Sequence, residues 1–186
     1  MDLEKGKAYA NRKNGTDNDF FQTPICLTKE LIKTGLLFGK KTILEPCCGK
    51  GAISNILKDF GFLVDERDLE LGNDFLEEEY NKKYDAVVMN PPFNLWDKFV
   101  EKAKTLSDLV ITIGRTNYFG SKSRKWKHLQ YVYIFNRQVA YNEELNSDGL
   151  INCGCLITGW FVFNKNYEGE PIIRFIDIDN YVRRTR

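Results

Sequence analysis

The stretch from Thr42 to Phe60, TILEPCCGKGAISNILKDF, decides the fold class of this chain. The apolar run from Thr42 to Pro46 predicts a short buried strand, and the spacing of apolar residues from Ala52 to Phe60 predicts a helix. Between them, Gly49 and Gly51 permit a tight turn that lets the backbone approach a ligand closely. A strand that passes through a glycine-rich turn into a helix is typical of α/β folds that bind ligands at this turn.

Further strands and helices alternate on both sides of this stretch. Helices are expected from Ile25 to Thr34, directly after Thr23 and Pro24, and from Leu95 to Leu106. Further strands are expected from Phe62 to about Asp68, Asp85 to Met89, Val110 to Ile113, Tyr131 to Val139, Leu156 to Phe163 and Pro171 to Ile178. The alternating part predicts a Rossmann-like, doubly wound and mainly parallel sheet of the α/β class. The last three strands have no long helix between them, which predicts antiparallel C-terminal strands.

The length of 186 residues fits one globular domain. Residues 1–19 are polar and cannot bury enough apolar surface to fold alone, so we expect a flexible tail or a lid there. We expect residues 20–186 to form a single domain with a basic insert around residues 115–150.

The composition excludes several classes of protein. Lys and Arg number 27 against 26 for Asp and Glu, and the formal net charge of +1 excludes both a uniformly basic surface and an acidic disordered protein. No apolar run approaches the roughly 20 residues that span a bilayer, and the first residues lack a secretory signal. We therefore expect a soluble cytoplasmic protein with no membrane partner. The five cysteines and single histidine predict neither a disulfide framework nor a metal site.

Two acidic residues accompany the glycine turn. Asp68 follows Gly49 by 19 residues, at the end of the second expected strand, where a carboxylate can accept hydrogen bonds from both hydroxyls of an adenosine ribose. Glu45 ends the first strand and Ser54 replaces the third glycine of the dinucleotide-binding pattern, so a pyrophosphate is disfavoured. A carboxylate at Glu45 attracts an ammonium group, such as that of S-adenosylmethionine. For the glycine pair alone, a plain turn with a solvated Asp68 is an equally good interpretation.

A four-residue motif directly follows the expected strand from Asp85 to Met89 and consists of Asn90, Pro91, Pro92 and Phe93. There, the Asn90 amide oxygen and the Pro91 backbone carbonyl can each accept one hydrogen from an exocyclic amino group, which makes its nitrogen a better nucleophile. The prolines hold the carbonyl in place, and Phe93 can stack on a planar substrate. A plain loop with Phe93 in the core is the alternative. The glycine turn about 40 residues upstream favours the catalytic interpretation.

These features resemble class I S-adenosylmethionine-dependent methyltransferases, and within them the small, phage-type N6-adenine DNA methyltransferases, whose signature is Asn or Asp followed by Pro-Pro and an aromatic residue. The resemblance covers residues 19 to about 115. It implies S-adenosyl-L-methionine as the cofactor and DNA as the substrate, in restriction-modification or phage DNA modification. The implied catalytic residues are Asn90, Pro91, Pro92 and Phe93, and the implied cofactor-binding residues are Phe21, Thr23, Glu45, Cys47, Gly49, Gly51, Asp68, Asp74 and Phe75.

A basic segment follows the fourth expected strand. Between Asp108 and Glu143 there is no acidic residue, although the rest of the chain has more acidic than basic side chains. Such a segment can follow a phosphate backbone while its aromatic residues stack on bases. The expected nucleic-acid-binding residues are Lys122, Arg124, Lys125, Trp126 and Lys127. A solvated lysine-rich loop with its aromatic residues in the core is the alternative.

Several functions remain open at this stage. The first is methyl transfer to the N6 amino group of adenine in DNA, and the same chemistry also suits an adenine in RNA or a glutamine amide in a protein. The remaining alternative is not an enzyme: it is a cofactor-binding or nucleic-acid-binding module without catalysis. Only about 35 residues, 115–150, are available for substrate recognition, which leaves open a homodimer, a short target site or a single-stranded substrate.

Overall fold

The computed structural model describes residues 22–124, 126–137, 139, 141, 157–178 and 181. Its helices are α2 (Ile25–Lys33), α3 (Ser54–Asp59) and α4 (Trp96–Leu106), with the short 3-10 helices η1 (Leu69–Leu71) and η2 (Thr116–Gly120). Its strands are β1 (Thr42–Glu45), β2 (Leu63–Glu66), β3 (Ala86–Met89), β4 (Leu109–Arg115), β5 (Leu129–Phe135), β6 (Thr158–Asn164) and β7 (Ile172–Ile176). Each of these helices and strands, apart from the two 3-10 helices, lies where the sequence predicts it, within a few residues.

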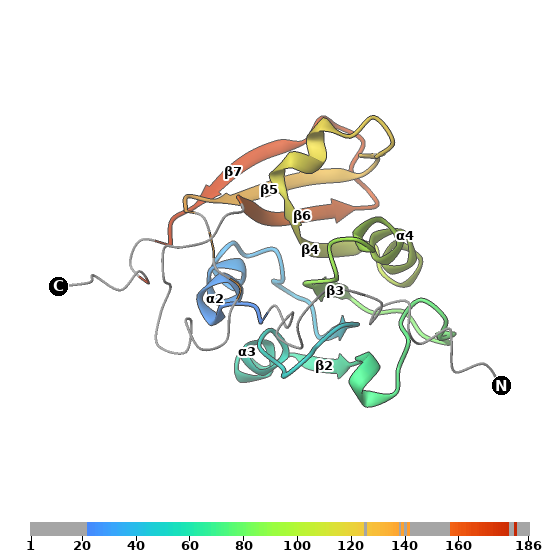
Figure 1. Ribbon diagram of the computed structural model, residues 1–186. Helices are drawn as coiled ribbons and strands as arrows, with labels where there is room; N and C mark the ends of the chain where they lie inside the picture. Colours follow the sequence, from blue (N-terminus) through green and yellow to red (C-terminus); the bar gives the residue numbers. More distant parts are fainter. Residues whose placement is uncertain are drawn as a thin grey trace, which may run out of the picture.

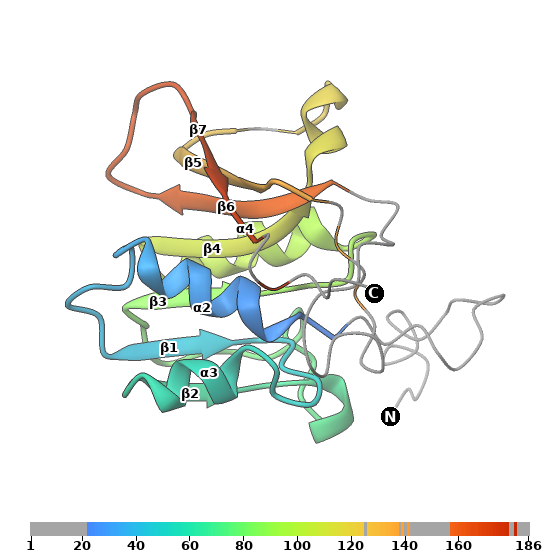
Figure 2. The same ribbon diagram turned by 90° about the vertical axis from the view of Figure 1, so that its left-hand side faces the viewer.

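The strands form one seven-stranded sheet in the order β2-β1-β3-β4-β6-β5-β7. β1 pairs in parallel with β2 and β3, and β3 pairs in parallel with β4. β6 pairs antiparallel with both β4 and β5, so β1 and β6 point in opposite directions in Figure 2. β5 and β7 pair in parallel with each other. The mainly parallel sheet is confirmed, and β6 provides the expected antiparallel pairing.

Helices cover both faces of the sheet. Helices α2 and α3 lie on one face, and α4 lies on the other (Figures 1 and 2). The face under α2 and α3 buries Leu27, Leu31 and Leu57, and the opposite core includes Phe99 and Val100 of α4. The expected doubly wound arrangement is therefore present.

Burial along the strands follows their place in the sheet. β3 is buried throughout, and β4 and β6 are buried except at one terminal residue. The edge strand β7 leaves Ile173 and Phe175 exposed. Two indole groups connect the layers, because Trp96 Nε1 donates to the Ile113 carbonyl over 2.9 Å and Trp160 Nε1 donates to the Leu27 carbonyl over 3.1 Å. The central strands and these contacts fix the ends of β1, β3 and β4 relative to one another.

The expected tail, residues 1–19, and much of the second half of the basic insert lie outside the described residues. Among the described residues, no helix is both long and apolar enough to cross a bilayer.

Candidate active site

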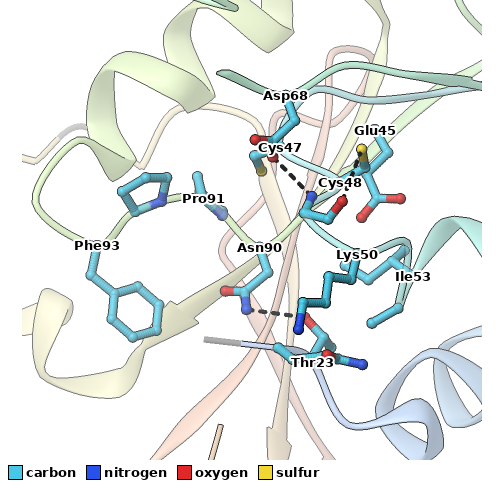
Figure 3. A pocket seen from close by; sticks show the side chains of 14 residues that line it. Thr23, Glu45, Cys47, Cys48, Lys50, Ile53, Asp68, Asn90, Pro91 and Phe93 are labelled. Carbon is cyan, nitrogen blue, oxygen red and sulfur yellow. Dashed lines mark hydrogen bonds between the residues drawn. The ribbon is translucent and has the colours of Figure 1, made fainter. Parts of the chain in front are cut away.

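A cavity lies at the carboxyl ends of β1 and β3, where chain segments distant in the sequence meet (Figure 3). Including the open solvent at its mouth, it holds about 720 Å³ of atom-free space. Many residues predicted from the sequence line it together: Thr23, Glu45, Cys47, Gly49, Asp68, Asn90, Pro91, Pro92 and Phe93. Parallel strands bring their carboxyl ends to one edge of the sheet, which explains why these residues meet.

The backbone of the glycine turn is left-handed at both glycines. Gly49 and Gly51 have φ angles of 51° and 82°, in the left-handed region that favours glycine. Gly49 lines the cavity, whereas Gly51 does not, and a Cβ at Gly51 would approach the Asn55 amide to 3.0 Å. Gly51 therefore shapes the turn and does not face the cavity.

Asp68 ties the turn to the end of β2. Its Oδ2 accepts a hydrogen bond from the backbone N–H of Gly49 over 2.8 Å, and its Oδ1 accepts one from the backbone N–H of Glu70 over 3.0 Å. Both carboxylate oxygens thus have backbone partners while the side chain also lines the cavity. The carboxylate holds the two loops together and presents a negative charge between them.

Glu45 is a buried carboxyl group at the end of β1. Its side chain is 1% exposed, and burial raises the pKa of its carboxyl well above the ordinary value, although hydrogen bonding by Ser54 offsets part of this effect. Its Oε2 is buried without a hydrogen-bond partner in the described part of the protein. Because the group also lines the cavity, it can receive a cation or hydrogen-bond donor of a ligand.

Asn90 follows β3 and presents its amide to the cavity. Its Nδ2 donates a hydrogen bond to the hydroxyl of Thr23 over 3.0 Å (Figure 3). The backbone of Asn90 also hydrogen-bonds the thiol of Cys47. After the two prolines, the Leu95 N–H donates to the Pro92 carbonyl over 2.9 Å and closes the turn into α4.

The ring of Phe93 lines the cavity and packs against two further groups. The guanidinium of Arg115, at the carboxyl end of β4, lies 4.4 Å from the ring centroid. Tyr141 contacts the ring edge-on, with centroids 6.4 Å apart. The Tyr118 hydroxyl donates to the Phe93 carbonyl over 3.2 Å, so the backbone of the residue is fixed as well.

A second cavity adjoins the first and shares Cys47, Asp68 and Pro92 with it. Leu69, Asn73, Phe75 and Phe99 are among its other lining residues. Phe75 was predicted from the sequence, whereas Asp74 does not line this cavity and instead accepts a hydrogen bond from the Leu76 N–H over 3.0 Å. The largely apolar lining suits an aromatic ring.

Lys102 of α4 holds the loop that carries Phe75. Its ammonium donates to the carbonyls of Leu76 over 3.1 Å and Glu78 over 2.5 Å. The same group lies 5.5 Å from the centroid of the Phe75 ring. The second cavity therefore has one wall fixed by hydrogen bonds from a helix.

The expected nucleic-acid residues are placed in different environments. Lys122 and Lys127 are exposed. Arg124 instead forms an ion pair with Asp97, with Nε and Oδ1 2.8 Å apart, and its guanidinium lies 3.9 Å from the Tyr118 ring centroid. Trp126 stacks on Phe161, with centroids 5.9 Å apart. The two lysines are thus surface cations, while Arg124 and Trp126 pack against the fold.

Two predicted residues, Phe21 and Lys125, lie outside the described residues. Among the residues that are described, no group of three or more His, Cys, Asp or Glu side chains is placed to hold a metal ion.

Sequence reasoning missed several lining residues. Lys50 lies between the two glycines, and its side chain points into the cavity (Figure 3). Gln22, directly before Thr23, lines the same cavity, and Asn73 lines the second one. Their positions next to predicted residues were a usable signal for all three.

Comparisons with known proteins add the fold family. A scan against protein-family models and a search of curated proteins both give no match. Among solved structures, the methyltransferase subunit of a type I restriction-modification system from Streptococcus thermophilus matches with a TM-score of 0.60 and 12% identity, over 83% of this chain and 46% of that one. The chain thus spans about half the length of that subunit.

Two further solved structures are similar. A candidate class I S-adenosylmethionine-dependent methyltransferase from Listeria monocytogenes matches with a TM-score of 0.61 and 12% identity, over 91% of this chain and 69% of that one. A candidate RNA methyltransferase from Pyrococcus horikoshii matches with a TM-score of 0.52 and 19% identity, over 89% of this chain and 99% of that one. The chain therefore has the Rossmann-like fold of the class I S-adenosylmethionine-dependent methyltransferases.

Proposed function

We propose that this protein transfers a methyl group from S-adenosyl-L-methionine to the exocyclic N6 amino group of adenine in DNA. The observation that carries the proposal is the meeting of the Asn90 amide with the buried Glu45 carboxyl in one cavity, at the carboxyl edge of a methyltransferase-like sheet. One group suits an amino acceptor and the other suits the cationic part of the cofactor.

The cavity residues fit the proposed cofactor. The unpartnered Oε2 of Glu45 accepts the ammonium of its methionine part, and Lys50 binds the carboxylate of the same part. Asp68 stands between the two cavities, where the ribose hydroxyls reach it, and the adenine ring enters the cavity beside Phe75. When bound, the cofactor supplies an electrophilic methyl group.

Asn90 and Pro91 activate the amino group of the substrate. The Asn90 amide oxygen and the Pro91 carbonyl each accept one of its hydrogens, and this concentrates electron density on the nitrogen. With the cofactor bound, its methyl group would pass to this nitrogen: the N–C bond would form as the C–S bond broke, and sulfur would keep the electron pair. The nitrogen then loses one proton to solvent. Phe93 supports the planar base.

Charge near the cavity favours a nucleic acid over a protein. Arg115 packs on the ring of Phe93, which lines the cavity, and exposed Lys122 and Lys127 follow in the same basic segment. These cations suit phosphates on either side of a target base that has left its stack. A type I restriction-modification subunit is among the similar structures, which supports DNA.

RNA adenine is the second candidate substrate. The match to the candidate RNA methyltransferase covers 99% of that chain, whereas the restriction-modification subunit has about as much chain again outside the match.

The test is methyl transfer from labelled S-adenosylmethionine to separate samples of single-stranded DNA, duplex DNA, RNA and a protein mixture, followed by digestion and identification of the labelled product. We expect label in N6-methyladenine from DNA. Label in N6-methyladenosine from RNA alone would show that RNA adenine, and not DNA adenine, is the substrate. Labelled methylglutamine would rule out both adenine substrates. Cofactor binding without transfer to any sample would favour a non-catalytic module.

A further inference from the structure

The hydroxyl of Thr23 is placed to control the orientation of the Asn90 amide. We infer that Thr23 is a positioning residue that keeps the amide oxygen of Asn90 directed at the substrate. The inference rests on the proposed function, because it assigns the amide the role of hydrogen-bond acceptor. It differs from the cofactor-binding role that the sequence resemblance implies for Thr23.

The first support is the hydrogen bond itself. Asn90 Nδ2 donates to Thr23 Oγ1 over 3.0 Å, and both residues line the same cavity (Figure 3). An amide is planar, so a partner that holds its nitrogen also fixes its oxygen. The terminal torsion of a free asparagine is broad, and rotation of the amide by half a turn exchanges the acceptor for a donor.

The second support is that Thr23 is itself held firmly. Its side chain is 4% exposed, and the following Pro24 restricts its backbone to extended conformations. Helix α2 begins two residues later and is anchored in the core by Leu27, whose side chain is fully buried and whose carbonyl accepts from Trp160. A segment 67 residues before Asn90 thus delivers a hydroxyl to a fixed point.

The third support is that the backbone of Asn90 has its own restraint. It follows the buried strand β3, and it hydrogen-bonds the Cys47 thiol. With the main chain fixed on one side and the amide nitrogen on the other, little freedom is left to the side chain. The hydrogen bond from Asn90 Nδ2 to the Thr23 hydroxyl therefore holds the amide in the orientation observed.

The wrong orientation is chemically costly. An amide nitrogen that faces the substrate presents hydrogens to the hydrogens of its amino group, so the acceptor is lost. Loss of the restraint is expected to lower kcat by about tenfold to a hundredfold, the scale seen when a catalytic group loses its geometry. Cofactor affinity is expected to stay unchanged, because the amide acts on the substrate amine.

The experiment compares Thr23→Val, Thr23→Ser and a matched control, Thr28→Val. Valine has the shape of threonine without the hydroxyl, and serine keeps the hydroxyl. Thr28 is also fully buried, lies in α2, and its Oγ1 has no hydrogen-bond partner among the described residues, so its replacement tests a buried hydroxyl away from the cavity. For each protein, kcat, KM and the Kd of S-adenosylhomocysteine are measured on the substrate identified with wild type.

Thr23→Val is expected to lower kcat with an unchanged Kd, while Thr23→Ser restores most of the rate and Thr28→Val matches wild type. A loss of S-adenosylhomocysteine affinity that accounts for the whole loss of rate would overturn the inference, and so would wild-type kcat in Thr23→Val. These outcomes are distinct from failure of the proposed function, in which wild type itself transfers no methyl group.

A second readout needs no activity. In nitrogen-15 NMR spectra, the side-chain amide protons of Asn90 are assigned by their loss in Asn90→Asp. We expect their hydrogen-bonded shift to move towards that of a solvated amide in Thr23→Val and to stay in Thr23→Ser and Thr28→Val. The same spectrum in wild type and Thr23→Val would overturn the inference.

Discussion

At the scale of single residues, the carboxyl group of Glu45 links the stability of the protein to the ligand that it binds. Burial raises its pKa well above 4.5, and its Oε2 has no hydrogen-bond partner in the described part of the chain. An acid whose pKa is higher in the folded state than in the unfolded state weakens folding as the pH rises above the unfolded value, since the unfolded chain then releases its proton first. The empty protein is therefore destabilised at neutral pH, and a bound cation relieves this effect.

Glu45→Gln removes the ionisable group and nearly keeps its shape. Without cofactor, we expect the Tm at neutral pH to rise by about 2–4 °C for each kcal/mol of destabilisation removed. Because the effect comes from ionisation, the difference from wild type should shrink as the pH falls towards 4.5 and disappear below it. Thermal unfolding of both proteins across this pH range checks the prediction. A difference in Tm that is independent of pH would contradict the electrostatic cause.

The same variant should lose cofactor. Removal of a charge-assisted hydrogen bond is expected to weaken S-adenosylhomocysteine binding by about tenfold to a hundredfold, measured by calorimetric titration. Higher stability with unchanged affinity would show that the ammonium of the cofactor binds elsewhere.

Asn90→Ala removes the proposed amine acceptor. We expect methyl transfer to fall below detection while the Kd of S-adenosylhomocysteine stays within about twofold, because Asn90 is assigned to the transition state. Transfer assays and calorimetry on the same preparation measure the two effects. The matched control is Asn94→Ala, an exposed asparagine just past the motif, which should keep full activity. A parallel loss of cofactor binding in Asn90→Ala would place the residue in the cofactor site.

At the scale of elements, the glycine turn shows what sequence reasoning can and cannot supply. Two glycines at a strand-to-helix junction predict a tight turn, and both have positive φ. Which of the two glycines faces the cavity depends on the torsion angles of the neighbouring residues, and the sequence does not show these angles. The sequence therefore assigned both Gly49 and Gly51 to the cofactor, although of the two only Gly49 lines the cavity. The same limit explains Asp74, whose neighbours Asn73 and Phe75 line the second cavity in its place.

Gly51→Ala tests the turn against a matched glycine. Gly51 and Gly61 have φ angles of 82° and 89°, so an alanine at either position is expected to lower the free energy of unfolding by about 1–2 kcal/mol. Gly61 lies past the end of α3, with open space around it, whereas a Cβ at Gly51 would lie 3.0 Å from the Asn55 side chain, within the turn that carries Gly49. Denaturant unfolding should therefore show similar losses in both variants, and only Gly51→Ala should weaken S-adenosylhomocysteine binding. Equal affinities in the two would contradict the role of the turn.

Helices and strands were predictable because apolar periodicity is a local signal. The strand from Asp85 to Met89, for example, is a short run that is buried on both faces as β3. The insertion of β6 between β4 and β5 was not predictable, since it depends on pairing between distant segments. The contact of Thr23 with Asn90 across 67 residues was hidden for the same reason.

At the scale of the whole molecule, only some of the basic side chains that cluster in the sequence form a positively charged surface. The sequence shows a basic segment without acidic residues, but it does not show which distant acid pairs with each base. Asp97 of α4 pairs with Arg124, and Trp126 packs on Phe161. Arg124 and Trp126 therefore attach the basic segment to the rest of the fold. Lys122 and Lys127 remain the described surface cations among the expected nucleic-acid residues.

Reversing the charge of Lys122 and Lys127 to Glu should weaken binding to a polynucleotide and flatten its dependence on salt. Each lost phosphate contact lowers the slope of log K against log salt by about 0.7–0.9. The control reverses Lys40 and Lys41, which precede β1 at the opposite edge of the sheet and change the net charge equally. Fluorescence anisotropy over a range of salt concentrations measures both. Equal slopes in the two double variants would place the nucleic acid elsewhere.

The position of β6 has a consequence for biosynthesis. β6 is made after β5, yet β5 reaches the central sheet only through it. During synthesis on the ribosome, one edge of β4 therefore stays unpaired, and residues 129–135 cannot join the sheet until residues 158–164 have emerged. The sheet therefore cannot be completed without β6. A nonsense codon just before Thr158 would yield a fragment with an unpaired, aggregation-prone strand edge rather than a smaller folded protein.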